Sequence, residues 1–348
     1  MSVDTGKLKI IDPGPATMVQ DMGRHAARRQ GVPVAGTLCP DWLQLANLLI
    51  GNPPDAAGLE FRLMGPRFTV EGAETTLAVA GPAELSLDGA EGSQTVPAWT
   101  AVRAQPGDRI AVGRITAGTT ALLVVSGGIA TDPFLGSRST YARAHLGGFE
   151  GRALRPGDIL PCGAPATTLL HQLSPAPSED VQAPIRVVLG PQDDHFDAAS
   201  ITAFLDGVYT VTNSVDRMGM RLEGPGLNHR SPEMREIVSD AIVPGAVQVP
   251  GNGQPIVLLA DGQTVGGYPK IATVISADLP RLARRAPTER IRFAAVSPAR
   301  AEALARAAQE DLAAYLAKAV PVTTAGGVDL RQLYETNLIS GVITGWTR

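Results

Sequence analysis

Short runs of apolar, β-favouring residues bounded by glycine and proline recur through most of the chain. Each of the clearest runs is followed directly by Gly-Pro or Gly-Gly, which is typical of strands that end in turns. A parallel α/β fold would need a helical segment after nearly every strand, and few such segments are present. The pattern therefore predicts a mainly β protein built of barrels or sandwiches. The clearest predicted strands are 76–80, 122–126 and 185–189.

Only two stretches place apolar residues three and four positions apart, as an amphipathic helix requires. The first covers 41–50 and is followed by the stop signal Gly-Asn-Pro-Pro, so we expect a short crossover helix on a β scaffold. The second begins at Ser297, a capping residue followed by proline at the first helical position. We expect it to be a peripheral element that closes the chain. Its apolar stripe consists of Ala301, Leu304, Ala305, Ala308, Leu312, Tyr315 and Leu316.

The domain boundary is predicted from composition. The segment 172–184 is rich in proline and small polar residues, as linkers are. Pentapeptides of the form Arg-Leu-x-Gly-Pro at 62–66 and 221–225 lie on either side of it, which is compatible with two halves of similar build. The predicted units are an N-terminal β domain over 1–175, a C-terminal β-barrel domain over 185–296, and a helix and tail over 297–348.

Composition and charge exclude several classes of protein. A chain of 348 residues with 44% apolar content can form about two domains with real cores. Its 30 basic and 34 acidic residues give no excess of positive charge that would bind nucleic acid or an anionic membrane. The chain shows no signal peptide, and no apolar run approaches the ~20 residues of a membrane helix. With only two widely separated cysteines, Cys39 and Cys162, we expect a cytoplasmic protein.

Several common catalytic motifs are absent from the sequence. Neither a G-x-x-x-x-G-K-[ST] phosphate loop nor a G-x-G-x-x-G turn occurs, so ATP would have to bind in another way. The chain also lacks the G-x-S-x-G and H-E-x-x-H signatures, and its five histidines stand singly. We therefore predict no metal site.

The densest polar cluster lies within 214–225, where two arginines and two acids are interleaved with glycines. The planar fork of arginine binds carboxylate or phosphate through two parallel hydrogen bonds. The cluster is therefore a candidate binding site for a carboxylate or a phosphorylated intermediate. The alternative is a turn tied together by internal Asp-Arg and Glu-Arg pairs. The candidate residues are Asp216, Arg217, Arg221 and Glu223.

A second polar cluster follows an apolar run, 256–260, that predicts a buried strand. Polar residues and a glycine pair after a strand present side chains and backbone N–H groups to a ligand. Asp261 and Lys270 are candidates for an acid/base or charge-stabilising pair, with Gln263 orienting the substrate. The alternative is an ordinary hairpin turn with a solvated lysine. The glycine pair in question is Gly266 and Gly267.

The N-terminal half contains two further loops, 19–24 and 135–140, that place arginines beside glycines and hydroxyl groups. Each alone is typical of an ordinary loop. Together with the C-terminal clusters they would line one groove between the halves, because clefts between domains are favoured ligand sites. The candidate binding residues in these loops are Gln20, Arg24 and Arg138.

The order of these motifs resembles the carboxyltransferase family whose members are variously called the C subunit of 5-oxoprolinase, allophanate hydrolase subunit 2 and KipA-like protein. The resemblance covers nearly the whole chain, and so many motifs in the same order are not expected by chance. It includes Val-Gln-Asp-Met-Gly-Arg at 19–24 and Asp-Gly-Gln-Thr-Val-Gly-Gly-Tyr-Pro-Lys at 261–270. The other matching segments are 31–36, 45–47, 51–52, 135–140, 190–192, 216–225, 248–250 and 337–342.

The resemblance implies cyclophilin-like β-barrel modules and an enzyme subunit that needs partners for activity. The implied partners are two other 5-oxoprolinase subunits, a KipI-like B subunit and a LamB/YcsF-like A subunit. In that assembly ATP, with magnesium, phosphorylates the lactam oxygen of 5-oxoproline before water opens the ring to glutamate. We expect Arg217 and Arg221 to hold carboxylate or phosphate, with Asp261 and Lys270 nearest the chemistry.

Two other functions stay open at this point. The first is carboxyl transfer from carboxybiotin to urea or a related amide, although the chain has no Met-Lys-Met biotin site and no ATP-grasp region. The second is a non-enzymatic KipA-type regulator that binds a KipI-like kinase inhibitor. A Ser-Ser-Lys amidase pattern is absent, so the chain does not resemble an amidase by itself.

Two positions depart from the pattern of the family. Relatives commonly have Gly-Ala-Met-Asp where this chain has Gly-Thr-Leu-Cys, so Cys39 replaces an acid. Val265 replaces the second threonine of Gln-Thr-Thr-Gly-Gly. Either change would alter activity or substrate if the missing group serves catalysis. The alternative for Cys39 is a small buried packing residue.

Overall fold

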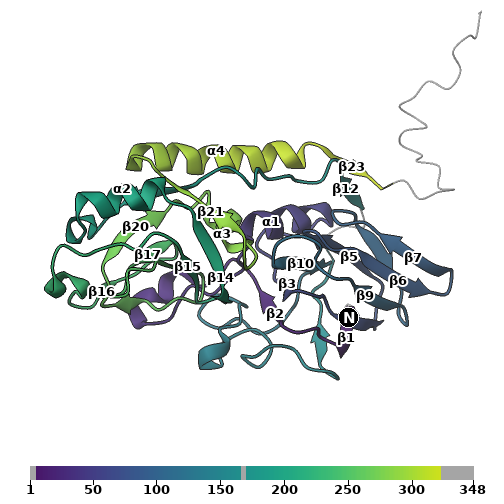
Figure 1. Cartoon of the computed structure of the whole chain (residues 1–348). Helices are drawn as coiled ribbons and strands as arrows, with labels where there is room; N and C mark the ends of the chain where they lie inside the picture. The colour runs from purple at the N-terminus through teal and green to yellow at the C-terminus, as the bar shows by residue number, and fades with distance from the viewer. Residues whose placement is uncertain (1–4, 166–169, 323–348) are drawn as a thin grey trace, which may run out of the picture.

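The computed structural model describes residues 5–165 and 170–322 (Figure 1). The family motif expected at 337–342 and the end of the predicted C-terminal tail lie outside the described residues. The predicted mainly β class is confirmed, with few helices and a nearly closed barrel-like sheet. Within the described part of the chain, no helix is long and apolar enough to cross a membrane. The division into units at 175 and 185 stays a prediction.

The N-terminal half contains two antiparallel sheets that pack around one apolar core. Strands β5 (Thr75–Ala80) and β10 (Thr120–Val125) are buried at every position, because one face meets this core and the other meets a helix. The first sheet has the order β11 (Ile159–Pro161), β1 (Lys7–Asp12), β4 (Arg67–Glu71), β9 (Arg109–Val112), β6 (Leu85–Gly89) and β7 (Gly92–Val96). The second has the order β2 (Thr17–Gln20), β3 (Gly58–Arg62), β10 (Thr120–Val125), β5 (Thr75–Ala80) and β8 (Val102–Ala104).

The C-terminal half contains one eight-stranded sheet around its own core. All of its strand pairs are antiparallel except the parallel pair β13–β22. The order is β21 (Arg290–Ile291), β14 (Tyr209–Val215), β15 (Gly219–Glu223), β18 (Ile256–Leu258), β17 (Ala246–Gln248), β20 (Lys270–Val274), β13 (Ile185–Leu189) and β22 (Phe293–Ala295). A separate ribbon pairs β16 (Asp240–Ala241) with β19 (Val265–Gly266).

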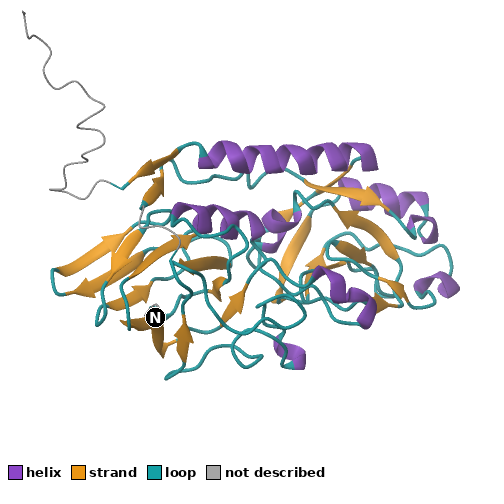
Figure 2. Ribbon diagram, turned by 180° about the vertical axis from the view of Figure 1, so that it is seen from behind, coloured by secondary structure: helices purple, strands orange, loops and turns teal. Residues whose placement is uncertain are grey.

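The two predicted helices are present and cover the strands on one side of the molecule (Figure 2). Helix α1 (Pro40–Leu49) packs on β5 and β10, where it covers the second face of the five-stranded sheet. Helix α4 (Pro298–Leu316) runs over both halves (Figure 1), and Ser297 accepts a hydrogen bond from the Arg300 N–H as its cap. After α4, β23 (Ala319–Pro321) pairs with β12 (His171–Leu173), so the chain returns to the N-terminal half.

Two short α-helices were not predicted, namely α2 (Ala198–Asp206) and α3 (Leu279–Ala283). In α2 only Ser200 and Phe204 are buried, so the helix shows too short an apolar stripe for recognition by periodicity. Its capping residue Asp197, which accepts from the Ser200 N–H at 2.6 Å, was the available signal. Four 3₁₀ segments complete the described fold: η1 (His25–Gln30), η2 (Ala142–Ala144), η3 (Asp193–His195) and η4 (Pro232–Arg235).

Truncation of the core of the N-terminal half tests this packing. Leu123 on β10 is 1% exposed, and Leu123→Ala is expected to lower the free energy of unfolding by about 2–5 kcal/mol. The matched variant Leu63→Ala removes the same atoms from a side chain that is 58% exposed, and should change it by less than about 0.5 kcal/mol. Urea titrations measure both, and equal effects of the two variants would contradict the assigned core.

Candidate functional site

Arg217 lies buried at the junction between the two halves and joins them. Its Nε and Nη2 donate to Asp261 Oδ2 and Oδ1 at 3.1 and 2.9 Å, a bidentate pair. Its Nη1 donates to the Glu60 carboxylate, and Nη2 also donates to the Gly36 carbonyl. Asp261 belongs to the C-terminal half, whereas Glu60 and Gly36 belong to the N-terminal half. We call these four residues the junction cluster.

Glu60 is a member of the junction cluster that sequence reasoning missed. It lies on β3 and is almost fully buried. Its Oε2 accepts from Thr37 Oγ1 at 2.8 Å and from the Leu38 N–H at 2.7 Å, which holds the segment before α1 against the sheet. The available signal was an acid inside an apolar strand, since a buried carboxylate requires a partner.

Burial and charge act in opposite directions on the junction cluster. Burial alone would lower the pKa of Arg217, but the carboxylates of Asp261 and Glu60 raise it above its ordinary value. Burial raises the pKa of Asp261; Arg217 opposes this shift, while the charge of Glu60 adds to it. Two buried carboxylates therefore share one arginine, and the repulsion and desolvation of these carboxylates oppose folding.

Asp21 ties the two predicted N-terminal loops together. Its Oδ1 accepts from Ser137 Oγ at 2.6 Å and Ser139 Oγ at 2.5 Å, and its Oδ2 accepts from the Arg138 N–H at 2.5 Å. The Arg138 side chain donates from Nε to the Thr131 carbonyl at 2.7 Å. The structure thus brings 19–24 and 135–140 together, as predicted, through an acid that sequence reasoning had not singled out.

Arg24 and Gln20 are buried in the same region. Arg24 Nη2 donates to the Ser139 carbonyl, and Gln20 Nε2 donates to the Thr140 carbonyl at 3.1 Å. Burial lowers the pKa of Arg24, while the charges of Asp21 and Asp261 oppose this shift. Arg24 therefore lies within electrostatic reach of the junction cluster, although its guanidinium donates to backbone carbonyls.

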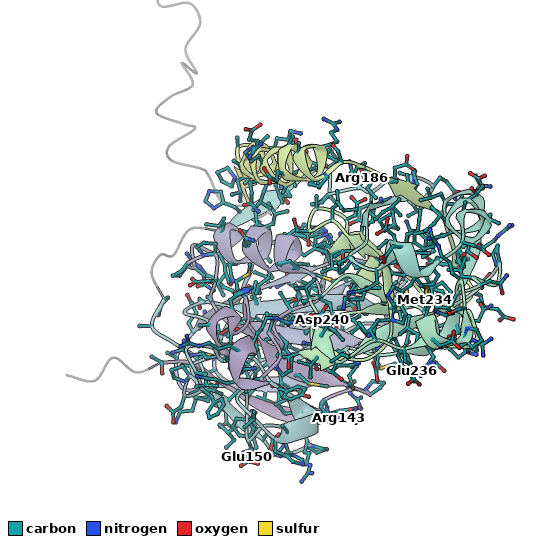
Figure 3. All side chains as sticks on the ribbon, turned by 90° about the vertical axis from the view of Figure 1, so that its left-hand side faces the viewer. Arg143, Glu150, Arg186, Met234, Glu236 and Asp240 are labelled. Atoms are coloured by element: carbon teal, nitrogen blue, oxygen red, sulfur yellow. The ribbon has the colours of Figure 1, made fainter. Side chains whose placement is uncertain are left out.

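Lys270 belongs to a second polar cluster inside the C-terminal half. It is 2% exposed, and its Nζ donates to Asp240 Oδ2 at 3.0 Å. Gln192 Nε2 reaches the same Asp240 oxygen at 3.3 Å, and Gln192 Oε1 accepts from the Lys270 N–H at 3.2 Å. Gln248 lies opposite Lys270 on β17. We call Lys270, Asp240, Gln192 and Gln248 the barrel cluster, of which Asp240 is labelled in Figure 3.

The predicted pairing of Asp261 with Lys270 is not what the structure shows, because Asp261 pairs with Arg217 and Lys270 with Asp240. The loop 261–270 instead begins in the junction cluster and ends in the barrel cluster. Between them, Gln263 is exposed and the glycine pair, Gly266 and Gly267, is partly exposed. The loop thus carries polar groups at both ends and an accessible segment between them.

Three candidates of the first polar cluster make no hydrogen bond in the junction cluster, although the charge of Asp216 helps to raise the pKa of Asp261. Arg221 and Glu223 point outward from β15, where they alternate with the buried Met220 and Leu222. Asp216 is exposed, and its Oδ1 accepts from the Met218 and Gly219 N–H groups, which closes a local turn. Of the candidates in 214–225, only Arg217 reaches Asp261.

A cleft of about 1080 Å³ lies between the halves, beneath α4. Thr37 and Ala260 line it, and these residues adjoin Glu60 and Asp261 respectively. Leu45 of α1 and Tyr315 of α4 form part of its largely apolar wall. A groove is therefore present between the halves, next to the junction cluster, but it is not lined by the polar clusters that were predicted to line one. Arg217, Asp261 and Lys270 do not themselves line it.

The two departures from the family pattern have different surroundings. Cys39 is fully buried among apolar residues at the start of α1, and burial raises the pKa of its thiol. This favours its interpretation as a packing residue rather than a reactive group. Val265 is largely exposed on the loop 261–270. In the part of the chain that the structure describes, no group of three or more His, Cys, Asp or Glu residues could hold a metal ion.

Comparisons with known proteins agree on one family. The model of the carboxyltransferase domain, subdomain A and B, matches residues 30–295. The chain is 39% identical to the C subunit of 5-oxoprolinase from Escherichia coli, over 80% of this chain and 87% of that protein. It is 35% identical to the C subunit of 5-oxoprolinase from Haemophilus influenzae, over 86% of this chain and 94% of that protein.

A solved structure shares the fold. The crystal structure of the K. lactis urea amidolyase superposes with a TM-score of 0.80 at 27% identity and covers 90% of this chain. The match covers only 20% of the urea amidolyase chain. The described fold is therefore one part of that larger protein.

Loss of the Arg217 bridge is expected to destabilise the protein strongly. Arg217→Met leaves two buried carboxylates without their partner, which should lower the free energy of unfolding by about 3–5 kcal/mol. Arg221→Met changes the same residue type on the exposed face of β15 and should have an effect below about 0.5 kcal/mol. Chemical denaturation compares them, and similar values would refute the bridging role.

The raised pKa of Asp261 gives a pH dependence with a defined sign. A carboxyl group that binds protons more tightly in the folded state stabilises the protein below its unfolded pKa of about 3.9, and this contribution is lost as pH rises through the folded pKa. The free energy of unfolding of the wild type, relative to Asp261→Asn, should therefore fall as pH rises above about 3.9.

Asp158 provides the control of opposite sign. Burial works to raise its pKa, but hydrogen bonds from Arg152 and Arg155 lower it below the ordinary value. The stability of the wild type relative to Asp158→Asn should therefore be lost as pH falls below about 3.9. Denaturant titrations across pH test both variants. The same slope in both would contradict the two assigned environments.

Proposed function

This chain belongs to the carboxyltransferase domain family, and on that premise we propose that it is one component of a cytoplasmic, ATP-dependent 5-oxoprolinase. The supporting observation is its match to two proteins named as the C subunit of 5-oxoprolinase, along most of their length and its own. The proposed reaction phosphorylates the lactam oxygen of 5-oxoproline with ATP; water then opens the ring, which releases glutamate, ADP and phosphate. A KipI-like B subunit and a LamB/YcsF-like A subunit complete the proposed enzyme.

The barrel cluster is the part of the chain that we assign to the substrate. Lys270 is a buried ammonium, and such a group stabilises negative charge that develops on a carbonyl oxygen. Its carboxylate partner, Asp240, is half exposed, so the ion pair can be reached from solvent. Gln263 and the glycine pair adjoin the cluster and would contact the ring.

The junction cluster is assigned a positioning role. Arg217 donates four hydrogen bonds to Asp261, Glu60 and Gly36, so its guanidinium is engaged by the protein rather than presented to an anion. We propose that it anchors the start of the loop 261–270 through Asp261. We assign no substrate contact to Asp216, Arg221 or Glu223, because they lie on the outer surface of the barrel.

ATP and magnesium enter the proposal as substrates of the complete enzyme. Magnesium bound with nucleotide is held mainly by phosphates and one or two carboxylates. No group of acids and histidines in the described residues fits a resident metal. No step is therefore assigned to a metal on this chain, and the partners are expected to supply part of the nucleotide site.

Carboxyl transfer from carboxybiotin to urea is the second candidate. The observation in its favour is the structural match to urea amidolyase. The matched region is a small part of that protein, so biotin carriage and carboxylation would have to come from separate chains. The chain matches the C subunits of two 5-oxoprolinases over 87% and 94% of their length and urea amidolyase over only 20%, and for that reason 5-oxoproline hydrolysis is preferred.

The reconstituted complex provides the test. Phosphate release that depends on 5-oxoproline is expected for the wild type and should fall by about 10²-fold or more in Lys270→Met. Lys9→Met removes an exposed lysine of β1 and should leave the rate unchanged.

Two outcomes would reject the proposed function, and a third would reject the assigned site. Turnover of urea in the presence of a carboxybiotin carrier, with none of 5-oxoproline, would establish carboxyl transfer instead. Binding of the KipI-like partner without turnover of any lactam or urea would indicate a regulator. A wild-type rate in Lys270→Met would remove the barrel cluster from the mechanism.

A further inference from the structure

Gln248 carries a buried amide that the protein itself does not satisfy. The side chain lies on β17 and is 2% exposed. Its Nε2 has no hydrogen-bond partner among the described residues. An unsatisfied buried donor costs about 1–3 kcal/mol, so such a group calls for a specific explanation. A ligand acceptor that completes its hydrogen bonding is one.

The neighbours of Gln248 place this donor beside an ammonium group. Gln248 and Lys270 are paired on the antiparallel strands β17 and β20, at a point where the register shifts by one residue. Both residues are 2% exposed. The pairing thus places a buried amide and a buried ammonium group on neighbouring strands.

Gly266 lies close to the amide. A Cβ at this position would lie 3.1 Å from Gln248 Nε2, 3.5 Å from Gln263 Nε2 and 2.6 Å from Ile242 Cδ1, so a side chain here would crowd Ile242 and the amide. Its φ is not in the left-handed region, so packing rather than backbone conformation explains the glycine. The glycine keeps the space beside Gln248 Nε2 free of a further methyl group. The exposed Gln263 and the half-exposed Asp240 border this space on the solvent side.

We propose that Gln248 Nε2 and Lys270 Nζ together bind one carbonyl oxygen of a small amide substrate beside Gly266. This inference rests on the proposed function, which places the substrate at Lys270, and identifies Gln248 as a substrate-binding residue. The charges of Lys270 and Asp240 cancel and the glutamines are neutral. The cluster therefore suits a neutral lactam or urea carbonyl better than a phosphate, whose negative charge would be left without compensation.

The first test uses Gln248→Leu and Gly266→Ala in the reconstituted complex. Gln248→Leu should raise the KM for 5-oxoproline roughly tenfold, as loss of one hydrogen bond implies, and Gly266→Ala should raise it because its methyl group crowds the amide. Neither variant should change the KM for ATP. Gln248→Leu should also raise the melting temperature, because it removes the unsatisfied amide. Gln94→Leu, on the exposed strand β7, is the matched control and should change neither quantity.

The second test measures binding without turnover. Ligand-observed NMR on the full chain should show binding of 5-oxoproline or urea by the wild type and its loss in Gln248→Leu. If the wild-type complex turns over neither compound but the chain binds one through Gln248, the proposed function fails and the site stands. Unchanged binding and KM in Gln248→Leu, a lower melting temperature of this variant, or no binding by the wild type would overturn the inference.

Discussion

The bidentate pairing of Arg217 with Asp261, extended to Glu60, is the buried interaction that most tightly constrains how the two halves meet. A buried guanidinium facing two carboxylates is stable only when all three are held in hydrogen-bonding geometry. Glu60 is held on strand β3 of the N-terminal half, and Asp261 follows strand β18 of the C-terminal half. Arg217 can therefore donate to both carboxylates only when the two halves are correctly docked. Any other docking of the halves would leave at least one of these buried charges without its partner, which is unfavourable.

The same constraint reaches the proposed substrate site through the chain. Asp261 begins the loop whose last residue, Lys270, lies in the barrel cluster. Hydrogen bonds fix both ends of this loop, at Asp261 and at Lys270. They therefore limit the conformations that Gln263 and the glycine pair can adopt between these ends. The cleft beneath α4 adjoins the junction cluster but has a largely apolar wall. Its chemistry differs from that of the barrel cluster, where charges and amides are concentrated.

Sequence patterns predicted the local features and the meeting of the loops 19–24 and 135–140, and missed the other long-range contacts of the site. Glycine and proline punctuation located the strands at 76–80, 122–126 and 185–189 because turn chemistry is local. Arg217, Asp261 and Lys270 were recognised as polar residues beside glycines, yet their partners Glu60 and Asp240 were not, since those contacts cross 157 and 30 positions. Polar and apolar residues alternate along β15, and this alternation alone predicts that Arg221 and Glu223 point outward. We instead expected them in the site because four charged residues occur close together in this segment.

Hydrogen exchange in Arg217→Lys tests the coupling between the two clusters most directly. Lysine keeps the charge but cannot form the bidentate pair, so the junction should weaken without leaving the carboxylates unpaired. The account predicts faster exchange of backbone amides across 261–270 than in the wild type, with 120–125 in the N-terminal core unchanged. Identical exchange of 261–270 in both proteins would contradict the claim that Arg217 holds this loop.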